Sequence, residues 1–234
     1  MGQFKSLLVL GAQWGDEGKG KITNYFSERA DVVVRYQGGN NAGHTIVFDG
    51  KKFALRLIPS GVFNENVKCV MAHGMVINPI AFLEEVEGLK QNGVNCHNIY
   101  VSDRAQVIFI HHLLLDELNE QSLGDKKIGT TKKGIGPCYT DKVARIGMRM
   151  VDFISDDFPM LYKTLLEVKN KQIVSLGGSP ISYDETLPIY EKVRQEMMPY
   201  VVDTIKLLSD EKEKGSKILF EGAQGALLDI DFGT

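Results

Sequence analysis

The sequence predicts an α/β protein in which a P-loop-type, mainly parallel sheet is flanked by helices and carries a largely helical insertion. Three observations lead to this fold class. Short apolar runs alternate with glycine-rich turns in the first third of the chain, and the run at 32–34 is "VVV". Uninterrupted runs of this kind are typical of parallel strands covered on both faces. A strand, a glycine turn, a helix and a second strand follow in the order of a βαβ unit, and beyond residue 110 the apolar spacing becomes helical.

The first part of the chain supplies most of the expected sheet. We expect strands at residues 6–10, 31–36, 45–48, 53–57, 67–72 and 99–102, with a helix at 19–30 between the first two. A second helix is expected over 78–93, because Asn78 can cap it, Pro79 suits its first turn and Gly93 can end it. The apolar face of this helix is expected to contain Phe82, Leu83, Val86 and Leu89.

The middle of the chain is expected to be a helical insertion. The stretch "HHLLLDELNEQ" is typical of a helix, the segment from 124 to 142 of a polar loop, and residues 156–172 and 184–208 of two further helices. Pro199 is expected to kink the last of these helices. The first of the two is expected to bury Phe158, Leu161, Leu165 and Val168. The run "KILFEGAQG" then predicts a strand that returns to the sheet. We therefore divide the chain into an α/β region at 1–109, a mainly helical insertion at 110–208 and a return strand at 209–234, all parts of one catalytic unit whose C-terminal remainder is missing.

Composition limits the kinds of binding partner and the cellular compartment that can be expected. The 234 residues carry a net charge of −3, from 27 basic and 30 acidic side chains, which gives no indication of nucleic acid or an anionic membrane as a partner. The start of the chain is too poor in apolar residues for a signal peptide, and no stretch has the length of a membrane span. Cys69, Cys96 and Cys138 form no CxxC pair, and their odd number fits a reducing compartment. We therefore expect a cytoplasmic protein.

The stretch "GDEGKGK", from Gly15 to Lys21, matches the G-x-x-x-x-G-K pattern of a phosphate-binding loop. Glycines let successive backbone N–H groups converge on phosphate oxygens, and the N-terminus of the following helix adds its positive dipole end. Ile22 stands where such loops usually have the Ser or Thr that binds magnesium, so Asp16 is the expected oxygen ligand of the metal. The alternative is a glycine turn that only joins the strand to the helix.

A second glycine loop, "GGNNAGHT", follows the second expected strand and contains His44. In a parallel sheet both loops would leave the carboxyl ends of their strands, where the sites of α/β proteins form. His44 is therefore a candidate general acid or oxyanion donor, with a purely structural histidine as the alternative. The other four histidines are expected to be structural. His111 and His112 are adjacent, so on a helix they should face different directions and not suit a shared metal.

Four segments together resemble the adenylosuccinate synthetase family: "QWGDEGKGK", "GGNNAGHT", "GTTKKGIGPCYTDKVAR" and "FEGAQGALLDIDFGT". They occur in the family's order and are spread over the whole chain, whereas a generic P-loop protein would share only the first. The resemblance implies GTP-dependent ligation of L-aspartate to IMP with Mg²⁺, the first committed step from IMP to AMP. It implies that O6 of IMP attacks the γ-phosphate of GTP to give 6-phosphoryl-IMP, and that the aspartate amine then displaces phosphate from C6.

The resemblance also assigns roles to residues. Asp16 matches the general base that takes the N1 proton of IMP, and His44 matches the general acid. Asp16 and the carbonyl of Gly43 match the magnesium ligands. The GTP contacts implied are Gly15, Asp16, Glu17, Gly18, Lys19, Gly20, Lys21, Gly43, His44 and Thr45. The IMP contacts implied are Asp16, Lys19, Asn41, Ala42, Gly43, His44, Thr131, Arg145 and Gln224.

Three of these IMP residues lie outside the first two loops. Thr131 matches a residue near the IMP phosphate, and Gln224 matches a hydrogen-bonding contact to IMP. Arg145 matches an arginine that reaches the IMP of the other subunit in a homodimer, where a guanidinium suits a phosphate. Without the resemblance, the segment "TTKKGIGP" would be interpreted as a solvated flexible loop.

The chains of the family are considerably longer than this one. The segments that bind L-aspartate and select guanine are absent from it, so we expect the chain alone to have little or no synthetase activity and to expose apolar surface. Two other interpretations stay open: a P-loop nucleotide switch or partition-type protein without ligase activity, and a folded fragment without function. IMP binding separates the first of these from the synthetase, and loss of both IMP and GTP binding in a folded sample would support the second.

Overall fold

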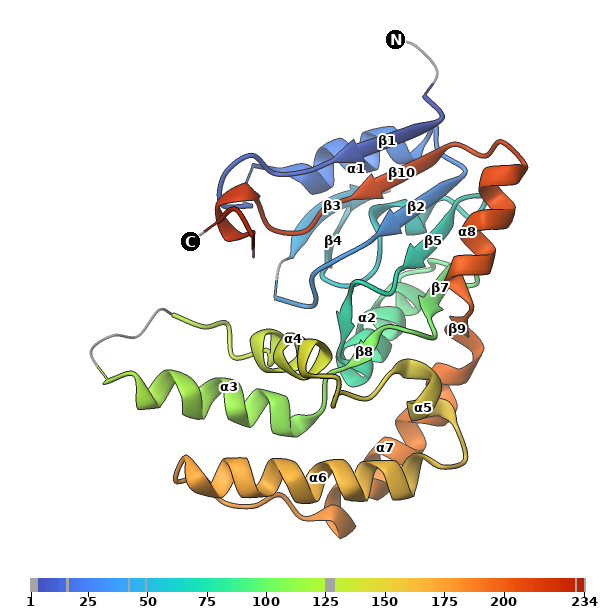
Figure 1. The fold of residues 1–234 in the computed structure, drawn as a ribbon. Helices are drawn as coiled ribbons and strands as arrows, with labels where there is room; N and C mark the ends of the chain where they lie inside the picture. The colour runs from blue at the N-terminus through green and yellow to red at the C-terminus, as the bar shows by residue number, and fades with distance from the viewer. Residues whose placement is uncertain are drawn as a thin grey trace.

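A six-stranded parallel sheet lies at the centre of the molecule (Figure 1). The computed structural model describes residues 4–15, 17–41, 43–48, 50–124, 129–229 and 231–233. The strands of the sheet are β1 (Ser6–Val9), β2 (Val32–Arg35), β5 (Lys68–Met71), β7 (Ile99–Ser102), β9 (Val201–Val202) and β10 (Ile218–Glu221). Their order is β1-β10-β2-β5-β7-β9, and every neighbouring pair is parallel. The α/β fold class predicted from the sequence is therefore confirmed.

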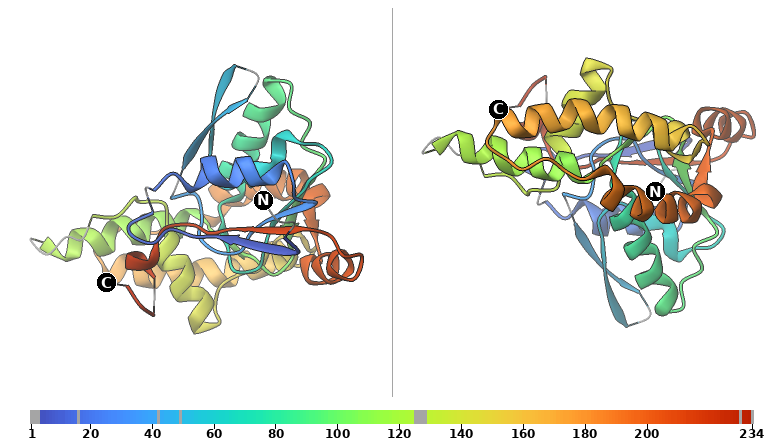
Figure 2. Two further views of the ribbon diagram at one scale, coloured as in Figure 1. Left: turned by 90° about the horizontal axis from the view of Figure 1, so that it is seen from above. Right: turned by 90° about the horizontal axis from the view of Figure 1, so that it is seen from below.

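The "VVV" run forms β2 and is covered on both faces, as its composition predicted. Val32 and Val34 pack on one face of the sheet with Leu207 and Leu208 of α8 (Thr204–Glu213). Val33 packs on the other face with Phe26 of α1 (Lys19–Ser27). In Figure 2, α1 is seen on one side of the edge-on sheet. Side chains alternate along a strand, so a continuous valine run serves both layers.

Several smaller elements surround the sheet. The expected strands around residue 50 form an antiparallel hairpin of their own, β3 (His44–Phe48) and β4 (Lys51–Leu55). Two short parallel strands, β6 (Val76–Ile77) and β8 (Gln106–Val107), form a third sheet. Helix α2 (Pro79–Gln91) is capped by the Asn78 side chain, which accepts hydrogen bonds from the amides of Ile80 and Ala81. The predicted N-cap of this helix is thus confirmed.

The middle of the chain is mainly helical, but three sequence-based predictions there are wrong in detail. Its helices are α3 (Ile110–Ser122), α4 (Ile135–Ala144), α5 (Met150–Ile154), α6 (Phe158–Ser175) and α7 (Tyr183–Met197). Residues 135–144 are helical although a loop was expected, because Cys138 and Tyr139 pack into an apolar cluster with Val76 and Ile108. The expected helix at 184–208 ends at Met197. A 3-10 turn that contains Pro199 leads into β9, which pairs with β7.

The third wrong detail is the buried face of α6. The structure buries Phe158, Tyr162, Leu166, Lys169 and Ile173, whereas Val168 is 53% exposed. Leu161 and Leu165 are only partly buried. The face is shifted because Lys169 points inward and pairs with Asp141 of α4, an arrangement that apolar periodicity cannot indicate.

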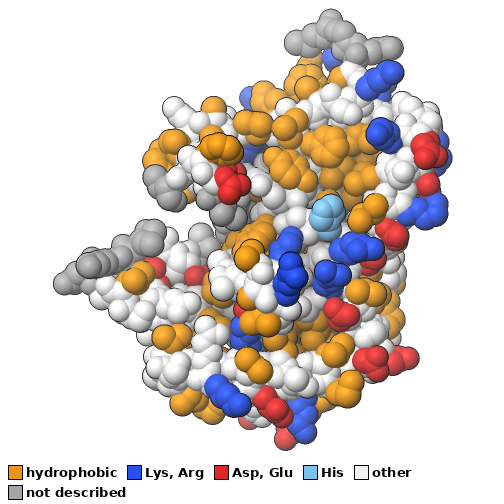
Figure 3. All heavy atoms as spheres, viewed as in Figure 1, with side chains coloured by type: hydrophobic (Ala, Val, Ile, Leu, Met, Phe, Trp, Pro, Cys, Tyr) orange, Lys and Arg blue, Asp and Glu red, His pale blue; other side chains and the backbone are white. Residues whose placement is uncertain are grey.

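An apolar row crosses the front face of the sheet; it is buried at Val34 and Val70 and exposed at its β1 end. Leu8, Phe220, Val34, Val70 and Tyr100 are aligned across five neighbouring strands. The outermost of them, Leu8, is 49% exposed, because β1 has no partner on its other side among the described strands. Figure 3 shows apolar side chains gathered on this face, above a group of basic side chains. None of the helices in the described part of the chain is long and apolar enough to cross a membrane.

An aromatic cluster forms the core of the helical part, and it contains two histidines. Phe109 is fully buried, with ring centroids 5.2 Å from Tyr162 and 5.0 Å from Tyr190. The ring of His111 stacks on Phe109 at 5.6 Å, and the rings of His111 and His112 lie 4.1 Å apart. The two adjacent histidines therefore lie side by side, contrary to the expectation that they face different directions.

Burial holds the pKa of His111 well below its ordinary value of 6.5, and the neighbouring His112 and Lys169 lower it further. Burial also lowers the pKa of His112, although Asp141 partly offsets this effect. The unfolded chain takes up protons near pH 6.5 that the folded chain does not. The free energy of unfolding must therefore fall as the pH decreases below about 6.5, by up to about 1.4 kcal/mol per pH unit for each such histidine.

We expect the melting temperature to drop by several degrees between pH 7.5 and pH 5.5. Asp141, whose pKa is already lowered from 3.8 in the folded chain, loses its contribution only at more acidic pH. The variant His111→Phe, which keeps an aromatic ring on Phe109, should show a shallower decrease in calorimetry. His97→Gln, at an exposed position, is the control and should follow the wild type. Equal pH slopes in His111→Phe and the wild type would contradict this account.

Candidate functional site

Three loops meet at one edge of the sheet, at the carboxyl ends of the neighbouring strands β1, β10 and β2. They line a cavity of about 580 Å³. The sequence-predicted residues that line it are Gly15, Gly18, Lys19, Gly20, Lys21, Asn41, Gly43, Thr45, Thr131 and Gln224. The cavity also contains Trp14, Arg35, Glu221, Gly222, Ala223 and Leu228. Parallel strands explain this convergence, because all of their carboxyl ends point the same way.

The glycine–lysine loop runs from β1 into α1. Gly18 precedes the helix with φ of 86°, a left-handed conformation that suits glycine, and Lys19 and Lys21 lie in the first helical turn. The Lys19 Nζ donates to the carbonyl of Gly15 at 2.9 Å and to Glu17 at 3.3 Å. Lys19, Gly20 and Lys21 thus line the cavity at the N-terminus of α1, a position where the helix dipole favours an anion such as phosphate.

Glu17 organises this loop from within. Its Oε1 accepts hydrogen bonds from the amides of Gln13 at 2.8 Å and Gly15 at 3.1 Å. These backbone hydrogen bonds, the one from Gly15 first, lower the pKa of Glu17 from 4.5 to about 2, with a smaller contribution from Lys19. The carboxylate is therefore ionised at neutral pH and holds the loop in shape.

The loop after β10 packs directly against the phosphate loop. Gln224 has φ of 55°, and its Nε2 donates to the Asn41 Oδ1 at 3.3 Å. A Cβ at Gly15, where φ is 100°, would lie 2.8 Å from the Cα of Gln224. Only glycine allows this approach. The amides of Gln224 and Asn41, from two different strand ends, consequently lie together at the cavity.

Tyr139 of α4 links the helical part to this edge of the sheet. Its hydroxyl oxygen accepts from the amide of Gly38 at 2.9 Å and donates to the carbonyl of Gly74 at 2.8 Å. Burial raises the pKa of Tyr139, so the phenol stays protonated and can donate. Together with Gln37 and Gln224, Tyr139 lines a neighbouring cavity of about 630 Å³.

Residues 129–134, which carry Thr131, are held by carboxylates of α3. The Asp116 Oδ1 accepts from the Thr130 hydroxyl at 2.7 Å, and its Oδ2 accepts from the Gly134 amide at 2.9 Å. The Glu120 Oε1 accepts from the Gly129 amide at 2.6 Å. Hydrogen bonds to α3 therefore anchor both ends of this segment, while Thr131 and Lys132 between them are exposed.

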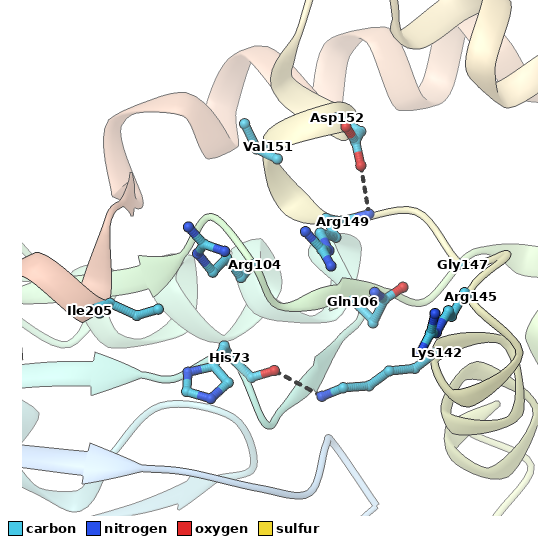
Figure 4. A pocket seen from close by; sticks show the side chains of 10 residues that line it. All are labelled: His73, Arg104, Gln106, Lys142, Arg145, Gly147, Arg149, Val151, Asp152 and Ile205. Carbon is cyan, nitrogen blue, oxygen red and sulfur yellow. Dashed lines mark hydrogen bonds between the residues drawn. The ribbon is translucent and has the colours of Figure 1, made fainter.

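Arg145 lies in a different place from the other predicted residues. It lines a cavity of about 800 Å³ together with His73, Arg104, Lys142 and Arg149, which gives this cavity a basic wall (Figure 4). The Lys142 Nζ donates to the carbonyl of His73 at 2.9 Å. Arg145 is absent from the described lining of the phosphate-loop cavity. The structure therefore separates this arginine from the site that the three loops form.

Some of the predicted residues have no described geometry. Asp16 and Ala42 lie outside the described residues, and so does the side chain of His44. The backbone of His44 begins β3, where it pairs with Leu55. Gly43, the residue just before it, lines the phosphate-loop cavity.

The donors on the cavity wall fit a hard cation. The backbone of Gly43 and the hydroxyl of Thr45 offer oxygen atoms beside the phosphate loop, and oxygen is the donor that Mg²⁺ prefers. The described lining of this cavity contains neither histidine nor cysteine, the donors that would favour a softer metal. A carboxylate in the phosphate loop, at position 16, would complete such a site.

Two buried charged residues of the cavity were not found from the sequence. Arg35 and Glu221 end β2 and β10, are aligned as partners across the two strands and are 2% exposed each. Glu221 accepts a hydrogen bond from the amide of Ser60 at 3.0 Å, and Arg35 donates to the carbonyl of Arg56. A charged residue that ends an otherwise apolar strand is the signal that could have identified both.

Comparison with known proteins identifies one family. The family model described as adenylosuccinate synthetase matches residues 8–234. The adenylosuccinate synthetase of Limosilactobacillus fermentum is 53% identical over 231 residues, which are 98% of this chain and 54% of that relative. That of Caldanaerobacter subterraneus subsp. tengcongensis is 51% identical and is covered to the same 54%. The chain thus spans about half the length of the curated relatives it matches.

A solved structure of the same family has a similar fold. The structure of fully ligated adenylosuccinate synthetase from Plasmodium falciparum is 37% identical and superposes with a TM-score of 0.89. It covers 99% of this chain, which corresponds to 54% of the solved one.

The hold of α3 on the loop at 129–134 can be tested with Asp116→Ala. Two hydrogen bonds are lost, so we expect the variant to be destabilised by about 1–3 kcal/mol and the amides of 129–134 to exchange at least tenfold faster. Asn119→Ala, at an exposed position of the same helix, is the matched control and should change stability by less than about 1 kcal/mol. Hydrogen exchange of both variants measures the difference. Unchanged exchange in Asp116→Ala would show that something else holds the loop.

Proposed function

This chain belongs to the adenylosuccinate synthetase family, and from that premise we propose that it forms the part of a ligase that binds GTP and IMP. The reaction joins L-aspartate to IMP and converts GTP to GDP and phosphate, giving adenylosuccinate. The observation that carries the proposal is the convergence of a phosphate loop, an asparagine–glycine loop and the Gln224 loop on one cavity.

The phosphates of GTP would bind at the start of α1. Lys21 and the amides of the first helical turn supply positive charge there, and Glu17 and Lys19 keep the loop open toward the ligand. Magnesium, held by Asp16 and the carbonyl of Gly43, would neutralise charge on the transferring phosphoryl group. Thr45 would complete the GTP contacts on the far wall of the cavity.

The chemistry proposed for IMP needs one proton removed and one charge stabilised. The Asp16 carboxylate would take the proton from N1, which makes O6 a better nucleophile toward the γ-phosphorus. The bond from this phosphorus to the GDP oxygen then breaks. His44 would stabilise the negative charge on O6 and the phosphoryl group. In the second step the aspartate amine attacks C6, and the phosphate leaves with the O6 oxygen.

The base and ribose phosphate of IMP would be bound by groups that the fold brings together. Gln224 and Asn41 present amides that both donate and accept, which fits the edge of a purine. Thr131, held in place from α3, would lie near the phosphate. Arg145 faces a separate basic cavity, which supports a role toward the IMP of a second subunit in a homodimer. We place the reaction in the cytoplasm, in keeping with three buried free cysteines.

The first test is the formation of adenylosuccinate from IMP, GTP, Mg²⁺ and L-aspartate. We expect calorimetry to show binding of IMP and GTP by this chain, and we expect product when the remaining half of the Limosilactobacillus fermentum relative is supplied. Asp16→Asn should abolish the product while GTP still binds. GTP binding without IMP binding would favour a nucleotide switch instead, and loss of both in a folded sample would overturn the proposal.

A narrower test concerns Gln224. Replacing it with Ala removes one to two hydrogen bonds to IMP, so we expect about tenfold weaker IMP binding and unchanged GTP binding. Gln195→Ala, at an exposed position of α7, is the matched control and should bind both as the wild type does. Equal IMP affinity in the Gln224→Ala variant would remove this residue from the proposed site.

A further inference from the structure

Asp141 is an ionisable residue inside the helical part of the molecule. It belongs to α4, is 3% exposed and receives hydrogen bonds from two other helices. The His112 Nε2 of α3 lies 3.0 Å from its Oδ2, and the Lys169 Nζ of α6 lies 2.5 Å from its Oδ1. Burial raises the pKa of Asp141, but the bonds from His112 and Lys169 outweigh this effect and lower it. The carboxylate is therefore charged in the folded chain.

The hydrogen-bond pattern fixes the proton on His112. Its Nδ1 accepts from the amide of Phe109 at 2.9 Å, so this nitrogen carries no proton. The proton must then sit on Nε2, which donates to Asp141, and the ring is neutral. Lys169 consequently supplies the positive charge that balances this carboxylate, and it is 3% exposed itself.

The same group has the composition of a metal site. One ligand atom each from His111, His112 and Asp141 lies within 4.8 Å of the others, and all three residues are buried. A metal ion there would have to displace the ammonium of Lys169 from the carboxylate. In the described structure the Lys169 ammonium already pairs with the Asp141 carboxylate, and this carboxylate joins α3, α4 and α6.

The backbone of Asp141 controls the end of α4. Its carbonyl accepts from the amides of Ile146 at 3.0 Å and Gly147 at 3.2 Å. Arg145 directly follows the last helical residue and precedes Ile146. Its φ of 62° is left-handed, which is uncommon for a residue with a side chain. The residue whose side chain is held by two neighbouring helices is therefore the one that closes the turn presenting Arg145.

We propose that Lys169, Asp141 and His112 form a buried positioning network that fixes the turn after α4 and so holds Arg145, at the edge of the basic cavity, in position to bind an anionic phosphate. This inference rests on the proposed role of Arg145. Buried ion pairs rarely add net stability compared with apolar residues of the same size, so a role in fixing geometry explains the network better than stability does.

The test uses phosphate as the probe and the whole chain as the protein. The Nε–H signal of Arg145 is followed by NMR during titration with inorganic phosphate, and amide exchange is measured at Ile146 and Gly147. The decisive variant is Asp141→Asn with Lys169→Met, which removes both charges and keeps an acceptor for His112. Lys171→Met, at an exposed position of the same helix, is the matched control.

We expect the double variant to stay folded, to bind phosphate at Arg145 at least fivefold more weakly, and to exchange the two amides at least tenfold faster. The control should match the wild type in both. A folded double variant with phosphate affinity and exchange rates within twofold of the wild type would overturn the inference. If wild-type Arg145 does not respond to phosphate, its anion-binding role fails, and the exchange rates alone then decide: faster exchange supports the network, and unchanged exchange overturns it.

Should the double variant fail to fold, Lys169→Arg replaces it. Arginine keeps the charge but changes the geometry of the donor, so stability should be largely retained while the Arg145 response to phosphate weakens. An unchanged Arg145 response in a folded Lys169→Arg variant would count against the network.

Discussion

Parallel pairing of β1, β10 and β2 is the constraint on which the rest of the structure depends. Three segments far apart in the sequence, ending at residues 9, 35 and 221, pair in register and so release their loops at one edge of the sheet. Each strand is too short to hold a site alone. Burial of the valine run on both faces holds the sheet together, and the ends of the strands determine where the loops begin.

The site itself depends on close contact between backbones. Gly15 approaches Gln224 so closely that a Cβ would clash, and a Cβ at Gly225 would clash with the carbonyl oxygen of Gln13. Side chains then hold the loops from behind: Glu17 within the phosphate loop, Tyr139 from α4 and Asp116 from α3. Glycines therefore allow the contact, and ordinary hydrogen bonds from the helical part keep it in place.

Helix α4 connects the two cavities that carry the predicted residues. Tyr139 anchors its middle to the loop after β2, while Lys142 and Arg145 at its end face the basic cavity. On its buried side, Asp141 is bound by α3 and α6. A displacement of this helix would therefore move Tyr139 and Arg145 together, so the helical part of the chain contacts both regions and does not only cover the sheet.

Local pattern in the sequence was enough to predict the α/β class, the glycine turn between β1 and α1 and the cap at Asn78, because each depends on residues close together in the chain. The family resemblance came instead from four segments spread over the chain. Local pattern did not predict that Val201 would join β7, that Lys169 would be buried, or that Arg35 and Glu221 would meet at the cavity. Those features depend on partners supplied by other strands and helices. A charged lysine is buried in a core only when a carboxylate pairs with it. The tertiary structure determines which carboxylate lies beside Lys169.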